Sequence, residues 1–113
     1  MEQKRYKIRY TYSSRNDIKE KKQYILDTFK YRGLAQRFTD KIKAAVDDLR
    51  LFPLGYKATG FRYRGYDIHI KSYDSYLLFF TVDKEQSEVT ILRILQDRQD
   101  WEYILVRWVQ QNS

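Results

Sequence analysis

The stretch YLLFFTVDKEQSEVTILRIL, residues 76–95, decides the fold class. Its first part, Tyr76–Val82, is apolar except for one threonine, which is typical of a central strand. The polar residues Asp83–Ser87 predict a turn, and Val89–Leu95 predict a further strand. Strands joined by so short a connection run antiparallel.

The strand pattern extends towards the N-terminus, on both sides of Gly65. Phe61 and Tyr63 alternate with two arginines, Arg62 and Arg64. Beyond the glycine, three apolar residues alternate with three polar ones: Tyr66, Ile68 and Ile70 with Asp67, His69 and Lys71. This period of two predicts strands with one apolar face, and the polar run at 72–75 predicts the turn after them.

A strand and two helices are predicted in the N-terminal half. Residues 5–12 alternate strictly and are expected to join the same sheet, with one face formed by Tyr6, Ile8, Tyr10 and Tyr12. The spacing predicts a first helix over Arg15–Tyr31. We expect Ser14 to cap it and Asp17 to add negative charge to its first turn.

The second helix is expected over Leu34–Leu51, after a break at Gly33. Its apolar residues fall at helical spacing: Leu34, Phe38, Ile42, Ala45, Val46 and Leu49. So short a break implies an antiparallel hairpin, and Pro53 ends the second helix. A short C-terminal helix is indicated by four apolar residues at i, i+3, i+4 and i+7: Trp101, Ile104, Leu105 and Trp108.

These elements predict an α+β fold in a single domain over residues 1–113. An antiparallel sheet of about four strands packs against the N-terminal helical hairpin, with a short C-terminal helix after the last strand.

Composition limits the chemistry. The chain has no cysteine and one histidine, so a disulfide framework and a thiolate or paired-histidine metal site are excluded, and we expect no cofactor. The opening MEQKRYKIRY does not resemble a signal peptide, and no apolar run approaches the ~18 residues of a membrane span. We therefore expect a soluble cytoplasmic protein that does not enter a membrane.

The net charge of +7 is unevenly distributed. Residues 1–56 carry 14 basic and 7 acidic side chains, whereas residues 57–113 carry 8 of each. The excess lies mostly between Lys4 and Arg32. Such a field favours an anionic partner, namely nucleic acid, the ribosome or an acidic protein. The alternative is a solvated surface that only aids solubility, and charge alone does not separate the two.

Three stretches together resemble the RelE/ParE superfamily of toxins. They are YKIRYTYSSRNDIKEKKQYI (Tyr6–Ile25), AAVDDLRLFPLGYK (Ala44–Lys57) and YLLFFTVDKEQSEVTILRILQDRQDWEYIL (Tyr76–Leu105). The likeness covers nearly the whole chain in order. It implies the toxin of a paired operon, neutralised by a labile and usually acidic antitoxin.

The resemblance leaves two targets open. Some members cleave messenger RNA on the ribosome without a metal, and others bind DNA gyrase and stall it on cleaved DNA. Metal-free cleavage needs a base, an acid and cations that hold the phosphate. The candidates for these roles are His69, Arg62, Arg64, Arg93 and Tyr103.

Each candidate also has a structural interpretation. His69 could pair with Asp67 or face solvent on the polar side of its strand. Arg62 and Arg64 could belong to an exposed strand face or an antitoxin contact.

The chain departs from the RNA-cleaving pattern at several positions. Asp67 and His69 stand where that branch has two lysines, Leu77 replaces an arginine, and Gln96 replaces a histidine. Arg98 is shifted relative to that pattern. The long helical hairpin and its FP-x-G ending look more like the gyrase-binding branch, which we favour. A third possibility is a nucleic-acid-binding module without toxic activity.

An acidic, partly disordered antitoxin is expected to cover the basic face near Lys7, Arg9, Lys19 and Lys22 and to fold as it binds. The residues assigned to partner binding are Lys7, Arg9, Lys19, Lys22, Lys71 and Arg98.

Overall fold

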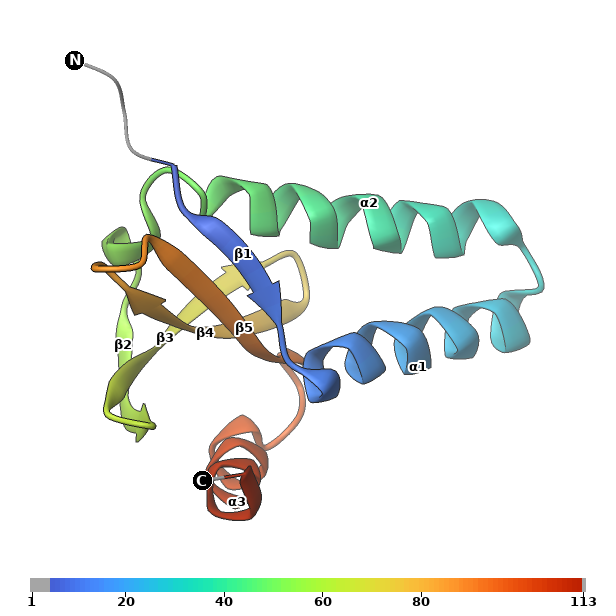
Figure 1. Cartoon of the computed structure of the whole chain (residues 1–113). Helices are drawn as coiled ribbons and strands as arrows, with labels where there is room; N and C mark the ends of the chain where they lie inside the picture. The colour runs from blue at the N-terminus through green and yellow to red at the C-terminus, as the bar shows by residue number, and fades with distance from the viewer. Residues whose placement is uncertain (1–4, 113) are drawn as a thin grey trace.

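One five-stranded sheet organises the chain, with a helical hairpin on one face and a single helix on the other (Figure 1). The computed structural model describes residues 5–112; Lys4, where the basic segment begins, lies outside this range. In order the elements are β1 (Lys7–Tyr10), α1 (Tyr12–Phe29), α2 (Arg32–Asp48), a 3₁₀ turn (Pro53–Gly55), β2 (Ala58–Tyr63), β3 (Tyr66–Tyr73), β4 (Tyr76–Asp83), β5 (Glu88–Gln96) and α3 (Trp101–Asn112). Every helix within this range is too short or too polar to cross a membrane.

The strand order is β1-β5-β4-β3-β2, which confirms the α+β fold, the meander and the central place of β4. The sheet has five strands instead of about four, and it is not wholly antiparallel. β1 joins it as expected but runs parallel to β5, in a register that pairs Lys7 with Glu88 and Tyr10 with Ile91.

Two apolar cores lie on opposite faces of the sheet. Leu78 and Phe80 of β4 pack with the hairpin, on residues such as Phe38. Leu77 and Phe79 pack on the other face, which α3 covers with Leu105 and Trp108. Because both faces are covered, β4 must be apolar on both sides, which explains its uninterrupted run.

α1 begins earlier than predicted. Its N-cap is Thr11, whose Oγ1 accepts a hydrogen bond from the amide of Ser14 at 3.0 Å, so the predictions of Ser14 as cap and of a strand through Tyr12 are wrong. Tyr12 lies in the first helical turn and is 86% exposed. The Thr11 hydroxyl also donates to the carbonyl of Leu92 at 2.7 Å, which fixes the end of β1 against β5.

The break between the two helices falls at Lys30 and Tyr31, not at Gly33. Lys30 adopts a left-handed conformation, with φ of 53°, and ends α1. Gly33 lies inside α2, where a Cβ would approach the Tyr31 ring to 2.8 Å. Because that ring is exposed and can move aside, Gly33 neither breaks the helix nor is required by packing.

The predicted polar face of β3 is partly inside the protein, because α2 and the segment after it cover that side of the sheet. Lys71 is buried, and its Nζ donates to the carbonyl of Ala45 at 2.8 Å and to Asp48 Oδ2 at 3.1 Å. The rings of Tyr56 and Tyr73 flank the ammonium group. Lys71 thus holds the C-terminal end of α2 against the sheet.

Asp17 anchors the base of the hairpin. Its carboxylate is buried and accepts hydrogen bonds from Arg93 Nε at 2.8 Å, from Arg93 Nη2 at 2.9 Å and from the amide of Ile94 at 2.9 Å. The prediction that Asp17 adds negative charge to the first turn is wrong, because α1 begins at Tyr12 and its first turn contains no acidic residue. β1 pairs with β5 no further than Ile91, so Asp17 satisfies β5 groups that no strand reaches.

We expect Asp17→Ala to lower the free energy of unfolding by about 3 kcal/mol, because it leaves a partly buried guanidinium and a buried amide without a partner. Urea denaturation followed by circular dichroism measures this. The control is Asp27→Ala, which removes an exposed carboxylate from the same helix. A loss no greater than that of the control would show that the ion pair does not anchor the hairpin.

Candidate functional site

Two of the nuclease candidates, Arg62 and His69, line the same shallow pocket of about 470 Å³. It lies between the β2–β3 hairpin and the turn that follows β4. Arg62 pairs with Asp67 at 3.4 Å and donates to the carbonyl of Gly65, so its guanidinium is held locally on the surface.

His69 is half-buried and lies on the face of the sheet that α1 and α2 cover. Its Nδ1 lies 3.0 Å from the carbonyl of Tyr56, and its ring stacks on Phe80 with 5.6 Å between ring centres. Since a carbonyl oxygen only accepts, Nδ1 carries the proton in this contact. The expected pairing with Asp67 is absent, because Asp67 pairs with Arg62 instead.

The other three nuclease candidates lie elsewhere. Arg64 occupies the β2–β3 turn with a φ of 52°, not a strand face, and its guanidinium lies over the Tyr63 ring. Arg93 is held by Asp17 at the base of the hairpin. Tyr103 is exposed on α3. The described structure therefore does not bring the five candidates together.

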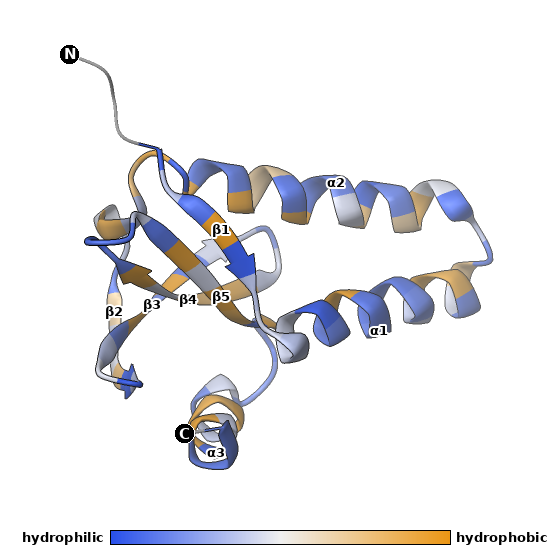
Figure 2. Ribbon diagram, viewed as in Figure 1, coloured by the Kyte–Doolittle hydropathy of each residue, from blue (hydrophilic) through white to orange (hydrophobic). Residues whose placement is uncertain are grey.

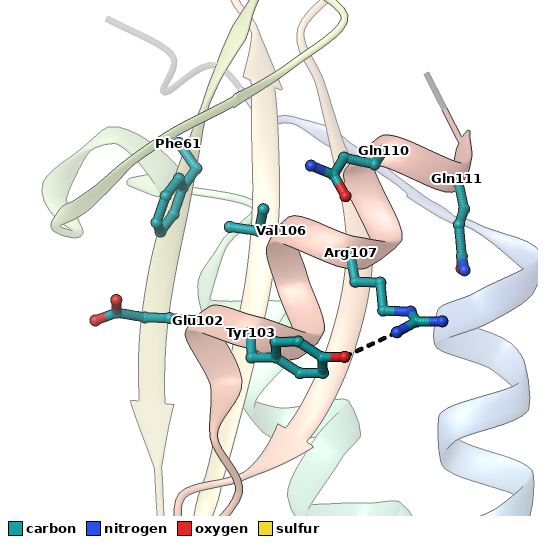
Figure 3. Close-up of a pocket in the computed structure, with 7 residues that line it drawn as sticks. All are labelled: Phe61, Glu102, Tyr103, Val106, Arg107, Gln110 and Gln111. Carbon is teal, nitrogen blue, oxygen red and sulfur yellow. Dashed lines mark hydrogen bonds between the residues drawn. The ribbon is translucent and has the colours of Figure 1, made fainter.

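A second pocket, of about 620 Å³, lies along α3 and is lined in part by Phe61 of β2 and Val106 (Figure 3). On the same helix, Arg107 Nη1 donates to the hydroxyl of Tyr103 at 2.8 Å. α3 is attached to the start of α1, because Trp108 Nε1 donates to Ser13 Oγ at 2.7 Å.

A third hollow, of about 810 Å³, lies between α1, α2 and the sheet end where β4 begins and β5 ends, and we call it the hairpin groove. Its lining residues are Glu20, Lys21, Tyr24, Ile25, Phe29, Leu34, Arg37, Phe38, Lys41, Asp74, Ser75, Tyr76, Gln96, Arg98 and Gln99.

Positive charge dominates the hairpin groove. Lys41 is paired with Asp74 at 2.8 Å. Within residues 5–112, the side chains of Lys21, Arg37 and Arg98 form no ion pair. Three cations that form no ion pair within this range thus meet from α1, α2 and the segment after β5.

Aromatic side chains accompany these cations. Tyr24 and Phe29 on α1 are 63% and 59% exposed, although they line the groove. Deeper in, Phe38 and Tyr76 pack with their ring centres 5.1 Å apart. The combination of free cations and exposed rings suits a ligand that is anionic and also has flat apolar groups.

Lys21 is held at an energetic cost. Burial lowers the pKa of its ammonium group below 10.5, and nearby Arg93 lowers it further, while Asp17 and Glu20 act in the opposite direction. A lysine whose charged form is disfavoured in the folded state points to a role other than stability.

Residues expected to bind a partner are divided between surface and interior. Lys7 and Arg9 are exposed on β1, Lys19 and Lys22 are exposed on α1, and Arg98 lies in the hairpin groove. Lys71 is buried and offers no surface to a partner. The sequence did not predict Lys21, Tyr24 and Arg37 as site residues, although the i, i+3 spacing of the first two places them on one side of α1.

Comparison with known proteins gives a consistent result. A family model described as "ParE toxin of type II toxin-antitoxin system, parDE" matches residues 8–101. The fold is similar to the chromosomal ParDE system from P. aeruginosa, with a TM-score of 0.65, 15% identity, and coverage of 80% of this chain and 95% of that one. It is also similar to the RelBE2 toxin–antitoxin complex from Mycobacterium tuberculosis, with a TM-score of 0.52, 22% identity, and coverage of 81% and 98%. A search of curated proteins finds no match.

We expect Lys21→Met to raise the melting temperature at pH 7 by roughly 2 °C, the effect of a few tenths of a kcal/mol in a domain of this size. The lowered pKa of Lys21 means that the folded state binds its proton less well than the unfolded state. The gain should therefore shrink as pH rises towards 10.5, where Lys21 loses its charge in the unfolded state as well. Lys22→Met, at an exposed position, is the control; a lower melting temperature for Lys21→Met alone would contradict this account.

Proposed function

Because the chain belongs to the ParE toxin family of type II toxin–antitoxin systems, we propose that it stops growth by binding DNA gyrase. The observation that carries this proposal is the hairpin. α1 and α2 have 18 and 17 residues, about 26 Å each, and project beyond the sheet (Figure 1).

The hairpin presents more polar surface than its packing needs. Most residues along both helices are hydrophilic (Figure 2), and the first helix has only two buried residues, Ser14 and Asp17. At the far end, Lys30 and Arg32 are exposed beside the ring of Tyr31, which is 59% exposed. A binding surface of this kind needs no catalytic group, since the target enzyme supplies the chemistry.

The alternative function is cleavage of messenger RNA on the ribosome. The pocket shared by Arg62 and His69 supports it, because a guanidinium and an imidazole could hold a phosphate and move a proton. Against it, Arg93 and Tyr103 lie away from this pocket. Gyrase binding therefore accounts for more of the described surface. A non-toxic nucleic-acid-binding module would use the same basic helices.

As a toxin of a type II system, the chain has an antitoxin partner. We propose that this antitoxin is acidic and covers Lys7, Arg9, Lys19 and Lys22 in the cytoplasm. β1 is an edge strand, so its outer backbone groups can pair with an extended segment of the partner. Lys7 and Arg9 flank that edge, and β1 leads directly into the helix that carries the other two cations (Figure 1).

We expect the purified protein to inhibit supercoiling by gyrase and to make linear plasmid accumulate after protease treatment. Lys30→Glu with Arg32→Glu reverses the charge at the hairpin tip and should raise the concentration for half-inhibition at least tenfold, because like charge opposes docking. Lys57→Glu with Lys84→Glu makes the same charge change on exposed turns and should inhibit like the wild type.

A cell-free translation reaction distinguishes cleavage of messenger RNA from gyrase binding. If gyrase is unaffected while the messenger is cut at discrete positions inside its reading frame, the gyrase proposal is wrong. His69→Ala and Arg62→Ala should then abolish cleavage.

Co-expression of the small protein encoded beside this gene should restore growth. We expect Lys7→Glu with Lys22→Glu to weaken that complex at least tenfold at low salt, mainly through slower association, because charge attraction steers the encounter. Biolayer interferometry at two salt concentrations measures both rates. Unchanged association would show that the antitoxin does not use these cations.

A further inference from the structure

We propose that the hairpin groove binds single-stranded DNA, with phosphates on its free cations and bases against its exposed rings. The inference rests on the proposed function, because gyrase stalled on cleaved DNA presents DNA strands beside its partner.

The free cations give the first argument. Lys21, Arg37 and Arg98 come from three separate segments, yet they line one groove and form no ion pair within residues 5–112. Of the two acidic residues there, Asp74 is paired with Lys41, and Glu20 accepts from Asn16 Nδ2 at 3.1 Å. The four basic and two acidic lining residues leave a net charge of +2 for a ligand, and guanidinium groups bind phosphates through paired hydrogen bonds.

The aromatic side chains give the second argument. Tyr24 and Phe29 are more than half exposed on the wall of a positively charged groove. Burying them in the domain would have been favourable, so their exposure suits a partner that covers flat rings. Bases of any sequence stack on such rings, and grooves that combine cations with stacking platforms are the usual means of holding single strands.

The shape of the groove favours a single strand over the other anionic ligands. A hollow of about 810 Å³ accommodates a drug-sized group, which corresponds to a short run of nucleotides. An acidic peptide would satisfy the three cations but would leave Tyr24 and Phe29 without flat partners. Nucleotides satisfy both features.

The test is fluorescence anisotropy of the purified protein with a fluorescein-labelled 12-nucleotide single-stranded DNA of mixed sequence. We expect saturable binding with a Kd on the order of 10 µM at 50 mM salt, and a log–log salt slope of about −2 for three phosphate contacts. Arg37→Ala with Arg98→Ala should weaken binding at least tenfold and bring the slope to about −0.7.

The aromatic contribution is measured separately. Tyr24→Leu with Phe29→Leu keeps the apolar volume but removes stacking, and should weaken binding at least fivefold without changing the salt slope. The charge-matched control is Lys43→Ala with Lys57→Ala, two exposed residues outside the groove, which should bind within twofold of the wild type. Thermal unfolding checks that all variants are folded.

Several outcomes would overturn the inference. One is the absence of saturable binding up to 100 µM, and another is an equal loss of affinity in the control and groove variants. The others are tenfold tighter binding of duplex DNA or of the same-sequence RNA, and displacement of the DNA by a decaglutamate peptide at equal concentration. None of these depends on gyrase. Inhibition of gyrase without single-strand binding would leave the proposed function intact, and single-strand binding without inhibition would refute the proposed function alone.

Discussion

The buried carboxylate of Asp17 is the contact on which the arrangement of the molecule depends. β4 and β5 change register at Phe79 and Phe80, so Leu92 is an extra residue in β5. Beyond the last residue of β1, the Thr11 hydroxyl donates to the carbonyl of Leu92, and the Asp17 carboxylate accepts from the amide of Ile94. A helix side chain thus completes the hydrogen bonding of a strand edge, and this sets the position of the whole hairpin. Ser13, between the same two residues, attaches α3.

Much of the architecture follows from local pattern. β4, the apolar stripe of α2 and the spacing in α3 were predicted because burial on a regular period is strong and local. The start of α1 was not, since Tyr12 continues the alternation of β1 although it belongs to the helix. The N-cap is Thr11, which is held in place by a hydrogen bond to the carbonyl of Leu92, eighty-one residues further along the chain.

The candidate site was harder to predict, for a related reason. Lys71 and Arg93 have the sequence pattern of surface cations, but each faces a carboxylate on the hairpin, so both act inside the protein. Only the tertiary structure brings those carboxylates near. The hairpin groove combines residues from both helices and from the segment after β5, and no sequence spacing connects Arg37 with Arg98. Exposed rings beside free cations become visible only once the helices are placed.

The parallel pairing of β1 with β5 also governs when the protein can become active. β1 cannot pair until β5 has been synthesised, because Lys7–Tyr10 pairs with Glu88–Ile91. At ordinary translation rates of 5–20 residues per second, some eighty residues take on the order of 4–16 s to synthesise. During that interval the nascent chain has no completed sheet, and its hairpin lacks the Asp17–Arg93 contact at its base. The fold is therefore completed only near the end of synthesis, when β5 becomes available to β1.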